Sequence, residues 1–443
     1  MKKNIFIITS CALVLAACSD TDSIKKDIQN SSDEAIGFET FTTKLTRAEN
    51  SSAGLNGNLE DYNTTFKVWG SKYVRNSAVT DPTAANYYTE TPVFGFEDGA
   101  TPAYPGQTVT FGTPTANEWN YSPKRFWDKS ATKYDFYAAS PATPSWVWDN
   151  VNKKLSLADF IISGTNMAEA NPSTSVIANK VMATNNTEDL MISTDITEHK
   201  TYTTQPVQLN FNHILSRLNI GVRKGTVLED AAFTVKLNSI KIYNMVKKGT
   251  FNEDGATVGS SLQNATTARW TKSTTVTDKF TGTTPMQFAP STALTITSSV
   301  TSNNYQYVYE GLVIPQQVAY KQTATAEEYA AETDATAKAN MFLLDGTNAK
   351  SAGAADDSAP YLVIDYQIEQ TGFTDRFVYY YNLADIFNGN GGTSAIDFNE
   401  GWQNNLMITL NPATIEFDAQ VYEWATDKDI EIDIPDEAPA NNP

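Results

Sequence analysis

Side chains that carry out nucleophilic or acid–base chemistry are scarce in this sequence, which has 443 residues, two histidines and two cysteines. His199 lies in a polar segment, whereas His213 follows a run of alternating apolar residues. A histidine beside a strand is usually packed or hydrogen-bonded, so we expect His213 to be structural. The sequence contains no Gly-x-Ser-x-Gly elbow and no phosphate-binding glycine loop. These observations predict no catalytic residue and no enzyme.

The sequence also offers few residues in a pattern that could bind a metal or form a catalytic pair of carboxylates. A structural zinc site needs a cluster of cysteine and histidine ligands, which two separated histidines do not provide. Asp427 and Asp429 offer oxygen ligands to calcium, but EF-hand spacing is absent. Among 51 acidic residues nothing singles out a carboxylate pair for glycoside hydrolysis. We therefore expect no metal and no cofactor, and a hydrolase stays a minor alternative.

Both cysteines lie close to the N-terminus. Two lysines and an apolar stretch over residues 4–17 precede Cys18, and Leu15-Ala16-Ala17-Cys18 resembles a bacterial lipobox. This pattern predicts a signal peptide over residues 1–17, cleavage before Cys18 and lipidation of its thiol. Cys11 would leave with the signal, so the mature chain would have no thiol for a disulfide or a zinc site. A secretory signal in which Cys18 is incidental is the alternative.

The charge balance restricts the partners. The chain carries 32 basic and 51 acidic residues, a formal net charge of −19. Phosphate binding needs a basic surface, so we expect no nucleic-acid partner. Adsorption to anionic lipid is opposed for the same reason, and the acidity is typical of a soluble surface protein.

Apolar residues alternate with polar ones along much of the chain, which predicts β-strands with one buried face. The alternating runs are Val207-Leu209-Phe211, Leu218-Ile220-Val222, Phe233-Val235-Leu237, Tyr305-Tyr307-Tyr309, Phe377-Tyr379-Tyr381 and Leu406-Ile408-Leu410.

Other parts of the chain lack this alternation. Residues 19–35 are polar, and we interpret them as a tether. Residues 76–118 and 141–186 are rich in Thr, Asn, Ala and Pro, and we expect long loops there.

Tryptophan residues gather in the loop-rich first half. Trp146 and Trp148 are two positions apart, which places both on one face of a strand. Exposed aromatic rings can stack on sugars, so these two residues are candidate glycan contacts. The alternative is that such rings cover the edge of a core.

Several short segments follow the lipobox in a fixed order along the chain. They are Ile36-Gly37-Phe38, Leu45-Thr46-Arg47-Ala48, Phe66-Lys67-Val68-Trp69-Gly70, Tyr134-Asp135-Phe136-Tyr137, Val207-Gln208-Leu209-Asn210-Phe211, Val313-Ile314-Pro315-Gln316 and Val421-Tyr422-Glu423-Trp424. Together these segments resemble the fimbrillin family of type V, Mfa-like pilins. The resemblance implies an all-β chain with two tandem β-sandwich domains of transthyretin-like topology. We place the signal at 1–17, the lipidated tether at 18–35 and the domains at 36–205 and 206–443.

The resemblance also implies a maturation step by an Arg-specific surface protease. The matching position is Arg47, with Ala48 as the new N-terminus. The cut would displace a strand that includes Ile36 and Phe38, and a strand of the next subunit would take its place. The alternating residues Ile430, Ile432 and Ile434 are the candidate donor strand. Pairing of this segment within its own domain, or a loose acidic tail, is the alternative.

We therefore expect a structural or adhesive pilus subunit at the cell surface, anchored by lipid in the outer membrane. Its partners would be other pilin subunits, the protease, and a host or glycan ligand. A surface lipoprotein that binds glycans through loop aromatics and never polymerises is the competing function. It would keep residues 36–47, whereas a pilus subunit would begin at Ala48.

Overall fold

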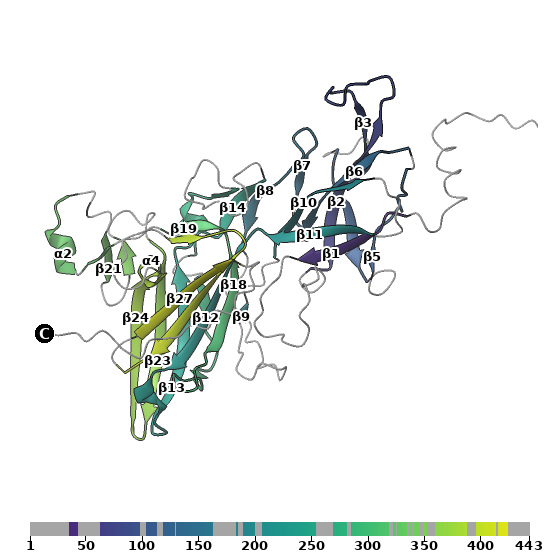
Figure 1. Ribbon diagram of the computed structural model, residues 1–443. Helices are drawn as coiled ribbons and strands as arrows, with labels where there is room; N and C mark the ends of the chain where they lie inside the picture. Colours follow the sequence, from purple (N-terminus) through teal and green to yellow (C-terminus); the bar gives the residue numbers. More distant parts are fainter. Residues whose placement is uncertain are drawn as a thin grey trace, which may run out of the picture.

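The structure of the chain is a computed structural model, and nearly every element in it is a β-strand, which confirms the all-β class (Figure 1). Residues described by it are 35–42, 63–97, 103–112, 118–128, 130–162, 183–184, 189–199, 206–253, 269–280, 285–318, 322–324, 326–334, 337, 341–344, 349–351, 359–387, 396–412 and 415–423.

The first part of the chain forms one large sheet. Within the described residues its strands are β1 (Phe38–Thr42), β2 (Thr65–Arg75), β3 (Tyr88–Phe94), β4 (Gln107–Phe111), β5 (Trp119–Asn120), β6 (Lys133–Ser140), β10 (Met191–His199) and β11 (Val207–His213). Their order is β1-β11-β10-β6-β2-β4-β5, and β3 pairs with β2. Val207, Leu209 and Phe211 are buried whereas Gln208 and Asn210 are exposed, so the predicted alternation in β11 is confirmed.

The first sheet continues past the expected domain boundary at residue 205. β11 follows that boundary in the sequence, yet it lies between β1 and β10 in this sheet. Composition suggested a boundary because the segment before Val207 is polar and rich in threonine. That segment instead connects β10 and β11, which are hydrogen-bonded neighbours.

Two further sheets share one hydrophobic cluster and form a sandwich in the second part of the chain (Figure 1). The order of the first is β27-β26-β12-β18-β9, and that of the second is β16-β13-β23-β24, with β17 beside β13. Their bounds are β9 (Ala183–Thr184), β12 (Ser216–Lys224), β13 (Thr234–Tyr243), β16 (Met286–Phe288), β17 (Leu294–Thr295), β18 (Gln306–Val313), β23 (Tyr361–Gln370), β24 (Phe373–Asn382), β26 (Trp402–Leu410) and β27 (Ile415–Glu423).

A fourth sheet combines strands from both parts of the chain. Its strands are β7 (Val147–Asp149), β8 (Lys154–Ile161), β14 (Lys248–Asn252) and β15 (Trp270–Lys272), in the order β15-β14-β8-β7. The ranges 76–118 and 141–186, where we expected loops, contain the strands β3, β4, β7, β8 and β9. β3 and β4 carry several Thr and polar residues, whereas β8 buries Leu155 and Leu157 on one face, so the overall composition of each long range hid the strands within it.

The remaining elements are short. They are β19 (Gln316–Val318) with β25 (Ile396–Phe398), β20 (Gln322–Ala324) with β21 (Met341–Leu344) and β22 (Ala349–Ser351), the helices α2 (Ala326–Ala331) and α4 (Leu383–Phe387), and two 3-10 turns over Thr226–Glu229 and Val276–Asp278. In the described ranges no helix has the length and apolar character that crossing a membrane requires.

Candidate functional site: the edge strand β1

β1 lies at the edge of the first sheet, among the strands that the structure describes (Figure 1). It runs parallel to β11, with Phe38 opposite Val207 and Thr42 opposite Phe211. Just before the strand, the N–H of Val207 donates a hydrogen bond of 2.8 Å to the carbonyl of Gly37. An edge strand is held by one ladder, so it can leave without separating two neighbours.

Three residues in or just before β1 point into the hydrophobic core of the first sheet, which we call the first core. Ile36 is 1%, Phe38 6% and Thr40 3% exposed, whereas Glu39 between them is exposed. This period of two is that of a strand with one face on a core. Full burial of an apolar side chain such as Ile36 or Phe38 stabilises a fold by about 1.5 to 3 kcal/mol. The segment is therefore an integral part of the core although it lies at the edge.

Phe38 is surrounded by four aromatic rings, which we call the aromatic pocket. Its ring centroid lies 5.4 Å from that of Phe94, 5.7 Å from Tyr121, 5.8 Å from Phe66 and 6.1 Å from Phe136. Phe66, Phe94 and Phe136 belong to β2, β3 and β6, and Tyr121 follows β5. Such edge-to-face and tilted contacts add roughly 0.5 to 1.5 kcal/mol per pair beyond area burial. The pocket thus favours an aromatic side chain in this position.

The loop over residues 121–126, which we call the clamp, holds the start of the segment from the side away from β11. The hydroxyl of Tyr121 donates a hydrogen bond of 2.6 Å to the carbonyl of Ile36. The N–H of Ile36 donates one of 2.9 Å to the carbonyl of Arg125, and Ala35 forms a bridge with Phe126. Burial raises the pKa of Tyr121 to about 12, so the hydroxyl keeps its proton at neutral pH.

The residues of the aromatic pocket and the clamp were not predicted as functional from the sequence. Phe66 and Phe136 belong to segments that carry the family resemblance, but Phe94 and Tyr121 did not stand out. The family resemblance implied a strand that includes Ile36 and Phe38, but it did not name the neighbours of that strand. The four rings come from three separate strands and the clamp loop, so only the tertiary structure brings them together.

Several predicted site residues lie outside the described residues. They are the lipidation site Cys18, the cleavage residues Arg47 and Ala48, and the candidate donor residues Ile430, Ile432 and Ile434. Arg47 and Ala48 follow β1 and precede β2 in the sequence. Of the residues predicted to take part in cleavage and strand exchange, the structure therefore describes only Ile36 and Phe38.

Trp146 and Trp148 lie in the core and not on the surface, so the prediction of a glycan contact there is wrong for this structure. Trp146 is 2% and Trp148 8% exposed. The indole N–H of Trp146 donates a hydrogen bond of 2.9 Å to the carbonyl of Pro141. The ring of Trp148 lies 4.6 Å from that of Tyr137 and 6.0 Å from that of Trp69. Stacking on a sugar needs an exposed ring face, and burial against these rings removes it.

His213 has the structural role that we expected. It is 4% exposed, and its Nδ1 lies 2.8 Å from Oδ2 of Asp189. A carboxylate beside one ring nitrogen fixes the orientation of an imidazole. Asp189 thus orients His213 within the packed end of β11.

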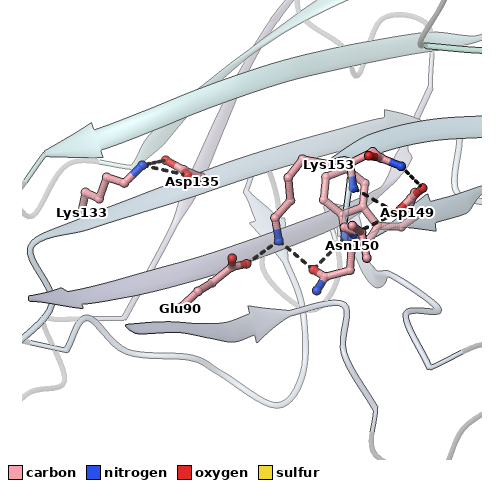
Figure 2. A network of polar contacts seen from close by, with 9 residues as sticks. Glu90, Lys133, Asp135, Asp149, Asn150 and Lys153 are labelled. Carbon is pink, nitrogen blue, oxygen red and sulfur yellow. Dashed lines mark hydrogen bonds and ion pairs between the residues drawn. The ribbon is translucent and has the colours of Figure 1, made fainter. Parts of the chain in front are cut away.

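A polar network ties β3 to the turn between β7 and β8 (Figure 2). Lys153 forms an ion pair with Glu90, and its Nζ donates a hydrogen bond of 2.9 Å to Oδ1 of Asn150. Asp149 accepts hydrogen bonds from the backbone of Asn152 and Val151, and these lower its pKa. Exposed pairs of this kind contribute little to stability, so the network orients the turn and does not anchor it.

Comparison with known proteins shows the family to which the chain belongs and several solved structures that it resembles. The sequence model of the fimbrillin-like family matches residues 78–424. A candidate cell adhesion protein from Bacteroides uniformis has a solved structure with 14% identity, 88% of this chain and 99% of that chain covered, and a TM-score of 0.36. A fimbrial protein from Bacteroides vulgatus shows 12% identity, the same coverage and a TM-score of 0.36. No curated protein matches. Because the family model spans most of the chain, this protein belongs to the fimbrillin-like family.

Proposed function

We propose that this chain is a structural or adhesive subunit of a cell-surface pilus, exported as a lipoprotein and assembled by protease-triggered strand exchange. Membership of the fimbrillin-like family supports a fimbrial role at the cell surface and a structural rather than an enzymatic one. The observation that carries strand exchange is the position of β1. It is an edge strand among the described strands, yet its inward residues fill the first core.

The proposed cleavage after Arg47 would act on the connection of β1. Arg47 lies between Thr42, where β1 ends, and Thr65, where β2 begins. A cut there would leave β1 held by its ladder with β11, the clamp and the aromatic pocket alone. Non-covalent contacts of this kind can be replaced by an equivalent set, whereas the intact connection would keep β1 at a high local concentration.

Loss of β1 would be costly without a replacement. It would expose the aromatic pocket and the unpaired backbone groups of β11 to water. An extended segment with alternating apolar side chains would restore both sets of contacts, as in other cases of strand addition. The empty site therefore favours uptake of a strand from another pilin subunit.

The two ends of the chain supply the other parts of the proposal. Cys18 would carry the lipid that anchors the subunit in the outer membrane until cleavage. Ile430, Ile432 and Ile434 alternate with acidic residues and are the candidate donor strand for the next subunit. An Arg-specific surface protease is the partner that starts assembly, and a host or glycan ligand is the partner of the finished pilus.

Mass spectrometry of the protein recovered from cells tests the proposal. We expect an acylated N-terminus at Cys18 in the membrane precursor, a new N-terminus at Ala48 in the assembled form, and SDS-resistant ladders. The variant Arg47→Ala should remove both the new N-terminus and the ladders. The control is Arg75→Ala, which changes an exposed arginine at the end of β2 and should leave assembly intact.

The outcome that contradicts the proposal is equally clear. Polymers whose subunits still carry residues 36–47 would show that β1 is not displaced. A protein that stays monomeric on cells with those residues attached would favour a lipoprotein that never polymerises.

A further inference from the structure

The position that β1 occupies has a chemical preference that can be read from its contacts. The three inward residues are Ile36, Phe38 and Thr40, and the middle one lies in the aromatic pocket. A pocket filled by one side chain sets specificity in strand addition, whereas backbone hydrogen bonds give affinity for any sequence. The aromatic pocket is therefore where an incoming strand would be distinguished.

Aliphatic side chains do not fill this pocket equally well. Four rings approach Phe38 at centroid distances of 5.4 to 6.1 Å, and two of its contacts are close to perpendicular, at 88° to Phe66 and 84° to Phe136. A branched aliphatic group is smaller and has no quadrupole, so it would lose these edge-to-face contacts and leave unfilled volume. A residue that lacks the ring should therefore bind with lower affinity.

The C-terminal segment of this chain does not carry the residue that the pocket favours. If Ile430, Ile432 and Ile434 took the three inward positions, Ile432 would replace Phe38. Residues 425–443 contain no Phe, Tyr or Trp, so no shift of register within that segment brings an aromatic side chain to the middle position. Pro435 lacks a backbone N–H and would end a ladder directly after Ile434.

We infer that the site of β1 selects a strand with an aromatic side chain at the middle of three inward positions, and that this strand comes from a different pilin subunit and not from a second copy of this chain. The inference rests on the proposed strand exchange and adds the identity of the partner. Two copies of this chain would bind each other weakly, which would keep the subunit from growing a homopolymer.

Competition between peptides tests this selectivity without changing the core of the protein. The mature chain with Cys18→Ser receives a specific protease site between Thr42 and Asn63 and a fluorophore at the N-terminal end of β1. After cleavage, unlabelled peptides compete with the labelled strand, and fluorescence anisotropy reports its release. The peptides are residues 35–42 with and without Phe38→Ile, and residues 428–434 with and without Ile432→Phe.

We expect the Phe38→Ile peptide to compete about tenfold more weakly than the unchanged peptide, as the loss of ring contacts and filled volume implies. The peptide of residues 428–434 should be weaker by at least a similar factor, and Ile432→Phe should recover much of the loss. A peptide with Glu39→Gln is the matched control, because residue 39 is exposed, and it should compete unchanged.

Two results overturn the inference in different ways. If the peptide of residues 428–434 competes as well as that of residues 35–42, or if Phe38→Ile causes no loss, strands exchange but the pocket does not select among them. If even the unchanged peptide of residues 35–42 fails to release the labelled strand, β1 is not exchangeable, and the proposed function fails together with the inference.

Discussion

Two segments of the first half of the chain, β1 and the hairpin of β7 and β8, both bury aromatic side chains but differ in how they are held. Among the strands that the structure describes, β1 pairs with β11 alone, and Phe38 packs within the core of the first sheet. β8 pairs with β7 on one side and with β14 on the other. Trp146 and Trp148 belong to the cluster that fills the sandwich in the second part of the chain.

This difference would separate an element that can be replaced, as we propose for β1, from one that stays in place. Removing β1 would open one core at its edge and leave the order of the remaining strands unchanged. Removing the hairpin would leave only β14 and β15 in the sheet where strands of both halves meet, and would open the larger cluster, to which Trp146, Trp148, Leu155 and Leu157 belong. A strand can thus serve as an exchangeable part only where its ladder is single and its side chains belong to one core.

The largest expected effect is on the hairpin. Trp146→Ala should lower the free energy of unfolding by about 4 to 5 kcal/mol, because it deletes a buried indole and leaves a cavity. Urea unfolding followed by far-UV circular dichroism measures the change. Val151→Ala is the control, since Val151 is 88% exposed at the turn of the same hairpin and should change stability by less than about 0.5 kcal/mol. Similar losses for both variants would mean that Trp146 does not hold the hairpin.

A smaller and more local effect is expected at β1. Phe38→Ala should weaken the docking of β1 by about 3 kcal/mol, because the aromatic pocket loses its occupant. Hydrogen exchange should show faster exchange at the amides of β1 and β11, with little change in β14. Glu39→Gln should exchange like the unchanged protein. Equal acceleration in β1 and β14 would contradict the independence of the two segments.

In the clamp, Tyr121→Phe should lower the free energy of unfolding by about 1 kcal/mol, because it removes the hydrogen bond to the carbonyl of Ile36. Hydrogen exchange of the Val207 amide, which bonds to Gly37, is a local measure of this loss. Lys124, whose Nζ lies 4.8 Å from the centroid of the Tyr121 ring, offers the control Lys124→Met. Its effect should be smaller, and a larger effect than that of Tyr121→Phe would argue against the hydrogen bond.

Alkaline pH should act through the same hydroxyl. Burial raises the pKa of Tyr121 to about 12 from a value of 10.0 in the unfolded chain. Between these values the unfolded state has lost the proton and the folded state has kept it, so the stability from Tyr121 is complete below pH 10 and is lost as pH rises towards 12. The unchanged protein should therefore lose more stability over this range than Tyr121→Phe. Parallel curves would show that the phenol is not buried.

The smallest effect is expected in the polar network at the hairpin turn. Lys153→Met should lower the free energy of unfolding by less than about 1 kcal/mol, because the ion pair of Lys153 with Glu90 is partly exposed. The cost should shrink further in high salt, which screens exposed charges. A loss as large as that of Trp146→Ala would reverse the view that side-chain burial, and not this network, holds the hairpin.

The sequence by itself determined which segments are strands wherever the alternation was clean. Val207, Leu209 and Phe211 share a buried face because side chains in any strand point to alternate sides. The scarcity of histidine and the absence of catalytic motifs were equally visible. In β3, β4, β7 and β8 the prediction failed. β3 and β4 are rich in Thr and polar residues, and β7 and β8 lie within a range whose overall composition is that of a loop.

Only the tertiary structure decided which strands are neighbours and which aromatic rings are buried. Alternation is a local property, whereas the pairing of β1 with β11 joins residues far apart in the chain. Trp146 and Trp148 could equally have faced water, but Trp146 packs on Phe251 of β14 and Trp148 on Trp69 and Tyr137 of the first sheet, which places both inside. The ring set around Phe38 arises in the same way, because it needs three strands and a loop to meet at one edge of one sheet.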